Sequence, residues 1–372
     1  MFSKINAWLH LWLGIAAGVP VIILSITGSV LVFEQEIKEL STDYIRVEAQ
    51  QAAHQLPPSV IYQAVKERLP EKEITSAWYY GLDKSVKVSL NNSDSVVYVN
   101  PYSAEILDVV NEEDFFHFME EGHRHLWIEG KVGKQLVGWS TAIFLLLLIS
   151  GLILWWPKKW TKRTRSQSFT IQWSAKFKRI NYDLHNVLGF YALTLAIVMC
   201  ITGLIMSFPW MRKSVIWLSG GYPVRPKTEL LGHPPEYSAI NLKDALLVAD
   251  QVWLKVRYEY AKFNKEAVIV HFPSATEHTV YACTDMKDGT WRDLTFDRNT
   301  LALTGRIMGP IDEANTTEWL MRANYALHTG FIGGMATKIG YFLASLICAT
   351  LPITGCYIWW NKKKKQFKPS RK

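Results

Sequence analysis

Four stretches of this 372-residue chain are long and apolar enough to cross a lipid bilayer. A membrane-spanning helix needs about 20 consecutive, mainly apolar residues, because the hydrocarbon core of a bilayer is roughly 30 Å thick. The four stretches cover residues 8–33, 134–156, 184–210 and 335–360. The sequence therefore predicts an α-helical membrane protein built on a four-helix transmembrane bundle.

The distribution of basic residues predicts how these helices are oriented, because Lys and Arg collect on the cytoplasmic side of a membrane. Residues 157–182 include eight Lys or Arg and no Asp or Glu, and the tail after Trp360 adds seven more Lys or Arg. Residues 34–122, in contrast, include seven basic and seventeen acidic residues. Both termini are thus expected in the cytoplasm, and the net charge of +8 reflects this topology, with no nucleic-acid partner expected.

The chain contains an internal duplication, in which each half consists of a helix, an external segment and a second helix. The first and third helices carry a Leu-His pair with Thr-Gly seventeen residues after the histidine, and the second and fourth carry Ser-Gly or Thr-Gly before a Trp-Trp pair. Because both halves begin on the cytoplasmic side, they are predicted to be parallel repeats. The matching pairs are Leu9-His10 with Thr27-Gly28, Leu184-His185 with Thr202-Gly203, Ser150-Gly151 with Trp155-Trp156, and Thr354-Gly355 with Trp359-Trp360.

Each predicted transmembrane helix has a histidine near one end. His10 and His185 lie at the cytoplasmic ends of the first and third helices, whereas His123 or His125 and His328 lie at the external ends of the second and fourth. Ionisable residues at membrane depth are costly and usually functional. Two histidines at each membrane face are what bis-histidine ligation of two haem irons requires. The alternative is that these histidines only anchor helix ends at the membrane interface.

The sequence also indicates how haem would be held. No Cys-x-x-Cys-His motif for covalent attachment is present, so two non-covalent b-type haems are expected. Gly14 and Gly189 follow His10 and His185 by four residues, which places each glycine on the same helical face as its histidine. A glycine at that position leaves room for a flat ring.

For the external ligand, helical phase favours His123 over His125, because Gly130 lies seven residues after His123 and shares its face if the segment is helical throughout. Arg124 and Lys134 near this site are candidates to bind haem propionates, since a guanidinium binds carboxylates bidentately. Contact with lipid headgroups is the alternative for both.

Each external segment is predicted to form one helix followed by short strands. In the first segment the helix is expected at 58–69, with strands at 74–80, 86–90 and 96–99. In the second segment the helix is expected at 242–256, with strands at 257–263, 267–272 and 279–283.

A helix-plus-strands module that ends in a Val-x-Val-Asn turn, as at 97–106, is similar to PepSY domains. The whole chain resembles the PepSY-associated transmembrane family. This family includes iron-regulated inner-membrane proteins, among them a siderophore reductase with two b-type haems. The resemblance implies a ferric-siderophore reductase that acts in the periplasm, and the family's His-Arg pattern also points to His123. The motifs that support the resemblance to this family are the Leu-His pairs with a glycine four residues later, His123-Arg124, Leu327-His328-Thr329-Gly330 with Gly333-Gly334, and the Trp-Trp pairs at the helix ends.

The resemblance implies two periplasmic α+β PepSY-like domains between the helices of a bacterial inner-membrane, multi-pass protein. The expected division is transmembrane helix 1 at 1–33, PepSY-like domain 1 at 34–122, an outer haem segment with helix 2 at 123–157, a basic cytoplasmic loop at 158–182, helix 3 at 183–210, PepSY-like domain 2 at 211–327, an outer haem segment with helix 4 at 328–360, and a basic cytoplasmic tail at 361–372.

No phosphate-binding glycine loop or dinucleotide fingerprint is present, so electrons are expected from another donor, such as a quinol in the bilayer or a cytoplasmic reductase. A ferric siderophore is the implied acceptor. Three alternatives remain: a haem carrier for a different periplasmic acceptor, a membrane-anchored PepSY regulatory or interaction protein without redox activity, and a transporter. The last lacks the intramembrane Asp or Glu that ion coupling needs.

Overall fold

The structure is a computed structural model that describes residues 2–51, 54–222, 240–261, 266–286, 289–305 and 308–366. The chain folds into two compact units. We call Met1–Glu34, Phe115–Val215 and Asn324–Lys372 the membrane unit, and Gln35–Asp114 and Ile216–Ala323 the sheet unit. Residues 367–372 of the predicted cytoplasmic tail lie outside the described residues.

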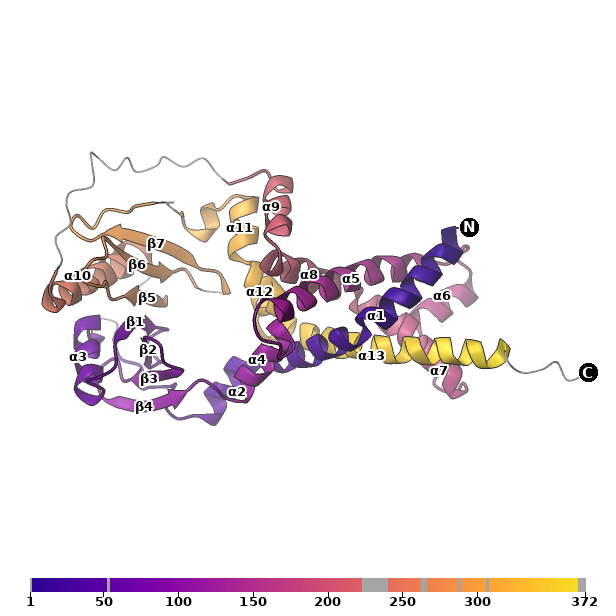
Figure 1. Ribbon diagram of the computed structural model, residues 1–372, viewed down its shortest axis with the longest axis horizontal. Coiled ribbons are helices and arrows are strands. Elements are labelled where there is room, and N and C mark those ends of the chain that lie inside the picture. Colours follow the sequence, from indigo (N-terminus) through magenta and orange to yellow (C-terminus); the bar gives the residue numbers. More distant parts are fainter. Residues whose placement is uncertain are drawn as a thin grey trace, which may run out of the picture. The chain divides into compact units, whose positions relative to one another are not determined.

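Four helical segments of the membrane unit are long and apolar enough to cross a membrane (Figure 1). They match the four predicted spans, but the first and third begin earlier than predicted and the last ends later. The prediction of an α-helical membrane protein is therefore confirmed. The segments are α1 (Phe2–Leu31), α5 (Lys131–Trp155), the continuous run of α7 (Phe177–Asp183), η2 (Leu184–Leu188) and α8 (Gly189–Ser207), and α13 (Gly334–Gln366).

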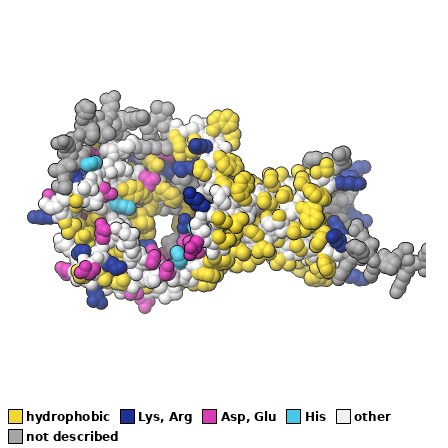
Figure 2. Space-filling model, viewed as in Figure 1, with side chains coloured by type: hydrophobic (Ala, Val, Ile, Leu, Met, Phe, Trp, Pro, Cys, Tyr) yellow, Lys and Arg dark blue, Asp and Glu magenta, His cyan; other side chains and the backbone are white. Residues whose placement is uncertain are grey.

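The exterior of this bundle is apolar. Val19, Trp139, Leu146 and Ile353 each expose more than half of their surface. Figure 2 shows hydrophobic side chains over the bundle, with Lys and Arg gathered at the end that carries α6 (Lys162–Phe169). A continuous apolar exterior is unfavourable in water but suits contact with lipid.

The interior of the bundle is formed largely by small side chains, which let the helices approach closely. α1 contacts α5 and α13, and α8 contacts the same two helices. The buried cluster between them consists of Leu148, Ala192, Ala196, Cys200, Ala344 and Cys348.

Two short helices, α4 (Phe115–His125) and α12 (Asn324–Thr329), precede α5 and α13 and carry His123 and His328. After α4 the chain turns sharply, because Leu126 and Trp127 both have φ of 55°. The Trp127 ring packs where a Cβ on Gly122 would lie, so only glycine fits at that position. The turn ends α4 before α5 begins. The remaining short helices are α2 (Glu34–Ser41), α9 (Pro209–Leu218), η6 (Ile311–Glu313) and η7 (Phe331–Gly333).

The sheet unit is built on a seven-stranded antiparallel sheet in the order β4-β3-β2-β1-β5-β6-β7. Its two halves come from the two segments between the transmembrane helices and meet where β1 pairs with β5, with Ala77 opposite Val270. The sequence indicates one module in each segment, and the structure joins their strands in one sheet. The strands are β1 (Ile74–Tyr79), β2 (Val86–Leu90), β3 (Ser95–Val99), β4 (Ile106–Asn111), β5 (Val268–His271), β6 (Thr279–Thr284) and β7 (Arg292–Asp297).

Helices α3 (Pro58–Arg68) and α10 (Leu242–Lys255) pack on this sheet and on each other. Their buried residues, such as Ile61 and Val252, join the inward side chains of the strands in a single core. The backbone N–H and the hydroxyl of Ser59 donate to the two carboxylate oxygens of Asp250 at 2.8 and 2.6 Å, which fixes α3 to α10. Burial raises the pKa of Asp250, and the bonds from Ser59 oppose that shift.

One strand prediction is wrong. The segment from residue 257 does not form a strand but continues from α10 into the π-helical turn η3 (Val256–Tyr260), which closes with Ala261 N–H donating to the Val256 carbonyl. Helical continuation keeps Ala249, Val252 and Val256 on one buried face, and this burial outweighs the local alternation of polar and aromatic residues. Residues 262 and 263 lie outside the described residues.

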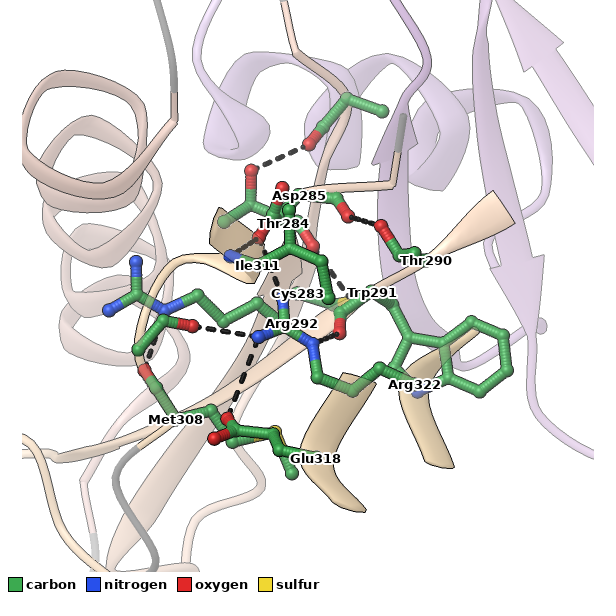
Figure 3. A network of polar contacts seen from close by, with 12 residues as sticks. Cys283, Thr284, Asp285, Thr290, Trp291, Arg292, Met308, Ile311, Glu318 and Arg322 are labelled. Carbon is green, nitrogen blue, oxygen red and sulfur yellow. Dashed lines mark hydrogen bonds and ion pairs between the residues drawn. The ribbon is translucent and has the colours of Figure 1, made fainter. Parts of the chain in front are cut away.

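A buried polar network surrounds Arg322 at the end of α11 (Thr316–Arg322), as Figure 3 shows. Its guanidinium lies 2.6 Å from Asp285 Oδ2 and 3.6 Å from Glu318 Oε1, and both carboxylates are buried. Arg322 Nε also donates to the Trp291 carbonyl at 2.7 Å, and Nη1 donates to the Gly309 carbonyl at 2.8 Å. These bonds join α11 to Trp291, the residue before β7, and to Gly309.

Candidate haem sites

The structure brings the predicted ligand histidines together in two pairs. The rings of His10 on α1 and His185 on η2 have centroids 6.4 Å apart and lie at 88° to each other. The rings of His123 on α4 and His328 on α12 have centroids 6.0 Å apart and lie at 58°. We call these the first and second histidine pairs.

The spacing within each pair suits one metal ion between the two rings. A metal–imidazole bond is about 2 Å long, so two nitrogens on opposite sides of one ion lie about 4 Å apart. Each ring centroid is about 1 Å beyond its nitrogen, which gives a centroid separation of about 6 Å. The observed 6.4 and 6.0 Å agree with this estimate.

In every case the histidine Nδ1 lies next to a hydroxyl of a neighbouring helix. The four distances are His10 to Ser150 Oγ at 2.8 Å, His185 to Thr354 Oγ1 at 2.9 Å, His123 to Thr27 Oγ1 at 3.1 Å and His328 to Thr202 Oγ1 at 2.9 Å. His123 and His328 also lie 3.0 and 3.1 Å from the carbonyls of Leu24 and Met199.

These contacts determine which ring nitrogen carries the proton. Each hydroxyl donates its single hydrogen to a carbonyl of its own helix, as Thr202 does to Val198 at 2.7 Å and Thr354 does to Thr350 at 2.9 Å. Thr27 and Ser150 do the same to Ile23 and Leu147. The hydroxyl oxygen therefore accepts from Nδ1–H, and Nε2 keeps its lone pair for a metal.

The residue after each of these hydroxyls is a glycine, and its missing side chain is where the histidine ring lies. A Cβ on Gly28 would lie 2.9 Å from Cε1 of His123. Cβ atoms on Gly151, Gly203 and Gly355 would each lie 3.3 Å from Cε1 of the histidine bound there. Each Ser/Thr-Gly pair that repeats in the sequence thus holds one of the four histidines: its hydroxyl lies next to Nδ1, and its glycine leaves space for the ring. We call each of these pairs a cradle.

Sequence reasoning missed a further part of this arrangement. Asn6, Asn181 and Asn324 each stand four residues before a histidine, in the repeated pattern Asn-x-x-Leu-His. Their side-chain amides donate to the carbonyls of Ser150, Thr354 and Thr202 at 3.1, 3.1 and 3.2 Å, the same residues whose hydroxyls bind the histidines. The fourth histidine, His123, has Met119 at that position. The threefold repeat of Asn-x-x-Leu-His is the sequence signal that could have identified these contacts.

A cavity of about 390 Å³ lies between the helices at the first pair. Its lining includes His10, His185, Gly14 and Gly189, so both predicted glycines face the space next to their histidines. The volume falls in the range of roughly 300–1,000 Å³ that is usual for ligand sites.

The remaining candidates near the second pair lie elsewhere. His125 Nδ1 is 3.2 Å from Glu121, and the exposed Arg124 forms an ion pair with Glu120 at 2.7 Å. Gly130 does not share a helical face with His123, because α4 ends at His125, and a Cβ on Gly130 would meet no atom within 4 Å. His123 faces His328 for a different reason, since Thr27 and Gly28 of α1 hold its ring.

The donor set suits a cofactor that brings its own equatorial ligands. Within the described residues no group of three or more His, Cys, Asp or Glu side chains could hold a metal ion. Each histidine pair could give two imidazole nitrogens to the iron of a macrocycle such as haem, which would bring the remaining ligands itself. The residues present therefore fit b-type haem.

Comparison with known proteins agrees with the motifs of the sequence. The family model described as the PepSY-associated TM region matches residues 7–362, nearly the whole chain. The comparison with curated proteins found no match. The match spans both histidine pairs, all four transmembrane helices and the sheet unit, and the chain therefore belongs to the PepSY-associated transmembrane family.

Proposed function

We propose that this protein is a di-haem b-type electron-transfer protein of the bacterial inner membrane that reduces a ferric siderophore in the periplasm and releases ferrous iron. The observation that carries the proposal is the pair geometry, with two rings about 6 Å apart and each Nε2 available as a donor. Haem bound by two imidazoles supplies a one-electron Fe(III)/Fe(II) couple. The chain's own residues would orient the imidazoles, through the hydroxyls that lie next to each Nδ1.

The two pairs belong to opposite ends of the bundle. On α1, His10 and the cradle residue Thr27 are seventeen residues apart, or about 25 Å of helix at 1.5 Å per residue. That length is most of a hydrocarbon core of roughly 30 Å. The basic segment that contains α6 follows the end of α5 that holds Ser150. The positive-inside rule then assigns the first pair to the cytoplasmic face, the second pair to the periplasmic face, and both termini to the cytoplasm.

The electron balance of the proposed reaction is simple. Each ferric ion takes up one electron and becomes ferrous, without a covalent bond to the protein. A quinol releases two electrons and two protons when it is oxidised to the quinone, so one quinol would balance two ferric ions. A cytoplasmic reductase could supply the same two electrons one at a time. Kinship to the family supports the siderophore as acceptor.

The first test mixes the reduced protein with ferric chelates in a stopped-flow instrument. We expect the reduced haem bands to reoxidise when a ferric hydroxamate is added, and a ferrous chelator to colour in step. His328→Ala should slow the reaction strongly, because the second pair would be the last site before the acceptor. His278→Ala, an exposed histidine of the sheet unit, is the matched control and should not slow it.

Two results would contradict the proposal in different ways. Reoxidation by oxygen alone, with no acceleration across a panel of ferric chelates, would leave a haem carrier for another acceptor. A purified protein without haem would favour a PepSY regulatory or interaction protein whose histidines are structural.

The glycine cradle gives a second expectation. Gly28→Ala would place a methyl group 2.9 Å from Cε1 of His123, so the ring must move before its Nε2 can bind iron. Disturbing the groups that orient a ligand typically weakens metal binding by about 10- to 100-fold. Haem release to an excess of a haem-binding acceptor protein, followed by absorbance, should therefore be faster for one of the two haems.

Gly340→Ala is the control, because its Cβ would lie 3.5 Å from Leu195 Cδ1, an ordinary contact. If Gly28→Ala holds both haems as firmly as Gly340→Ala does, the cradle has no part in ligand orientation.

A further inference from the structure

The cavity at the first histidine pair is polar at one end only. Away from the basic end of the bundle its lining is apolar, with Gly18 and Val21 of α1, Phe144 of α5, Leu193 of α8 and Leu351 of α13. A charged group placed among these side chains would lose its hydration without gaining a partner.

The other end of the cavity carries hydrogen-bond donors and one cation. Tyr182 and Asn186 lie three residues before and one residue after His185, and Lys362 lies seven residues after Gly355. Among the described residues that line the cavity, Lys362 is the one Lys or Arg, and no Asp or Glu is present. Leu351 and Lys362 are separated by eleven residues of α13, or about 16 Å of helix.

A nearby guanidinium is already engaged. Arg179 lies over the ring of Tyr182 at 5.6 Å, but it forms an ion pair at 2.9 Å with the buried carboxylate of Asp183, and its Nε donates to the same carboxylate at 3.0 Å. Its charge is therefore compensated within the chain. Lys362 is the cation of the lining that remains for a ligand anion.

This distribution matches a flat ligand with an apolar body and carboxylates along one edge, which is the chemistry of b-type haem with its two propionates. We propose that Lys362 is the counter-charge for the propionates of the cofactor at the first pair, so that the propionate edge faces the basic end of the bundle. The inference rests on the proposed function, because it takes haem as the ligand of the cavity.

A positive charge close to a propionate favours the reduced state of the iron, because it offsets negative charge near a centre that gains an electron. Replacing Lys362 with Gln should therefore make reduction at the first pair less favourable. We expect the equilibrium constant for reduction to fall roughly three- to tenfold, and a tenfold fall is about 59 mV for a one-electron couple.

The test is a spectroelectrochemical titration of the full-length protein in lipid nanodiscs. In Lys362→Gln one of the two haem couples should move to lower potential while the other stays in place. Lys362→Arg should keep the wild-type value. Lys363→Gln is the matched control, because its ammonium lies 4.7 Å from the Trp359 ring and it does not line the cavity.

Equal potentials in Lys362→Gln and Lys363→Gln would overturn the inference, and so would a shift of both couples together. If those potentials are unchanged while the protein still binds two haems and reduces ferric chelates, the proposed function stands and only the role of Lys362 fails. If the wild-type protein binds no haem, both fail.

Discussion

His185→Ala is expected to lower the haem content of the purified protein from two per chain to one. The variant removes one of the two imidazoles proposed to bind haem at the first pair, while the second pair keeps both of its histidines and both of its Thr-Gly cradles. His10→Ala should have the same effect, because the two imidazoles face each other across one site. A pyridine haemochrome assay on protein expressed with sufficient haem measures the stoichiometry, and the visible spectrum should retain one low-spin, six-coordinate species.

Variants at the second pair provide an internal control for the haem stoichiometry. His123→Ala should lose one haem, whereas His125→Ala, only two residues away on α4, should keep both, because its ring is paired with Glu121 and is not directed to His328. The opposite result for His123 and His125 would show that the wrong histidine has been assigned. Two haems in every single-histidine variant would exclude bis-histidine ligation altogether.

Arg322→Ala should destabilise the sheet unit by about 3–5 kcal/mol, the usual effect of removing one partner of a buried ion pair. Arg322, Asp285 and Glu318 are only 3 %, 5 % and 2 % exposed. Without the guanidinium, two carboxylates remain buried next to each other, and the carbonyls of Trp291 and Gly309 lose their donor. Thermal unfolding of the full-length protein, followed by pulse proteolysis with cleavage sites mapped by mass spectrometry, measures the loss in the sheet unit.

Lys255→Ala is the control for this prediction. Its ion pair with Glu259 is more exposed and joins residues four apart, so its loss should change stability by only about 0.5 kcal/mol. A similar small effect for Arg322→Ala would mean that the two carboxylates of the network lose little when the guanidinium is removed. Arg322 would then have no role in holding α11 on the sheet.

The amino-acid sequence alone was sufficient for the features that depend on local composition. The lengths of the apolar stretches predicted the four transmembrane helices, and the structure confirms them. The helix at 58–69 and the strands at 86–90 and 279–283 were also predicted, because apolar residues recur there with the period of the element they form. In contrast, β4 and β7 were missed. β7 carries Arg292, Asp293 and Asp297 on a short run, and only its pairing with β6 makes it a strand.

The candidate site was predictable in part for the same reason. The sequence indicates four histidines at helix ends and a duplication that pairs them, because a repeated spacing can be recognised without a structure. It could not indicate which groups hold each ring. His123 and the Thr27-Gly28 cradle are about a hundred residues apart, and the glycine chosen from helical phase, Gly130, lies beyond the turn that ends α4.

The membrane class, the helix spans and the residue types available for binding a metal thus follow from the sequence without a structure. The packing of the folded chain was needed to show which hydroxyl faces which imidazole, which nitrogen is left for a metal, and that β1 and β5 join two segments in one sheet. These two sets of features differ in the range of the interactions that produce them. Helix formation and lipid contact depend on neighbouring residues. The hydrogen bond between His185 and Thr354, in contrast, joins residues 169 positions apart and forms only after their helices have packed together.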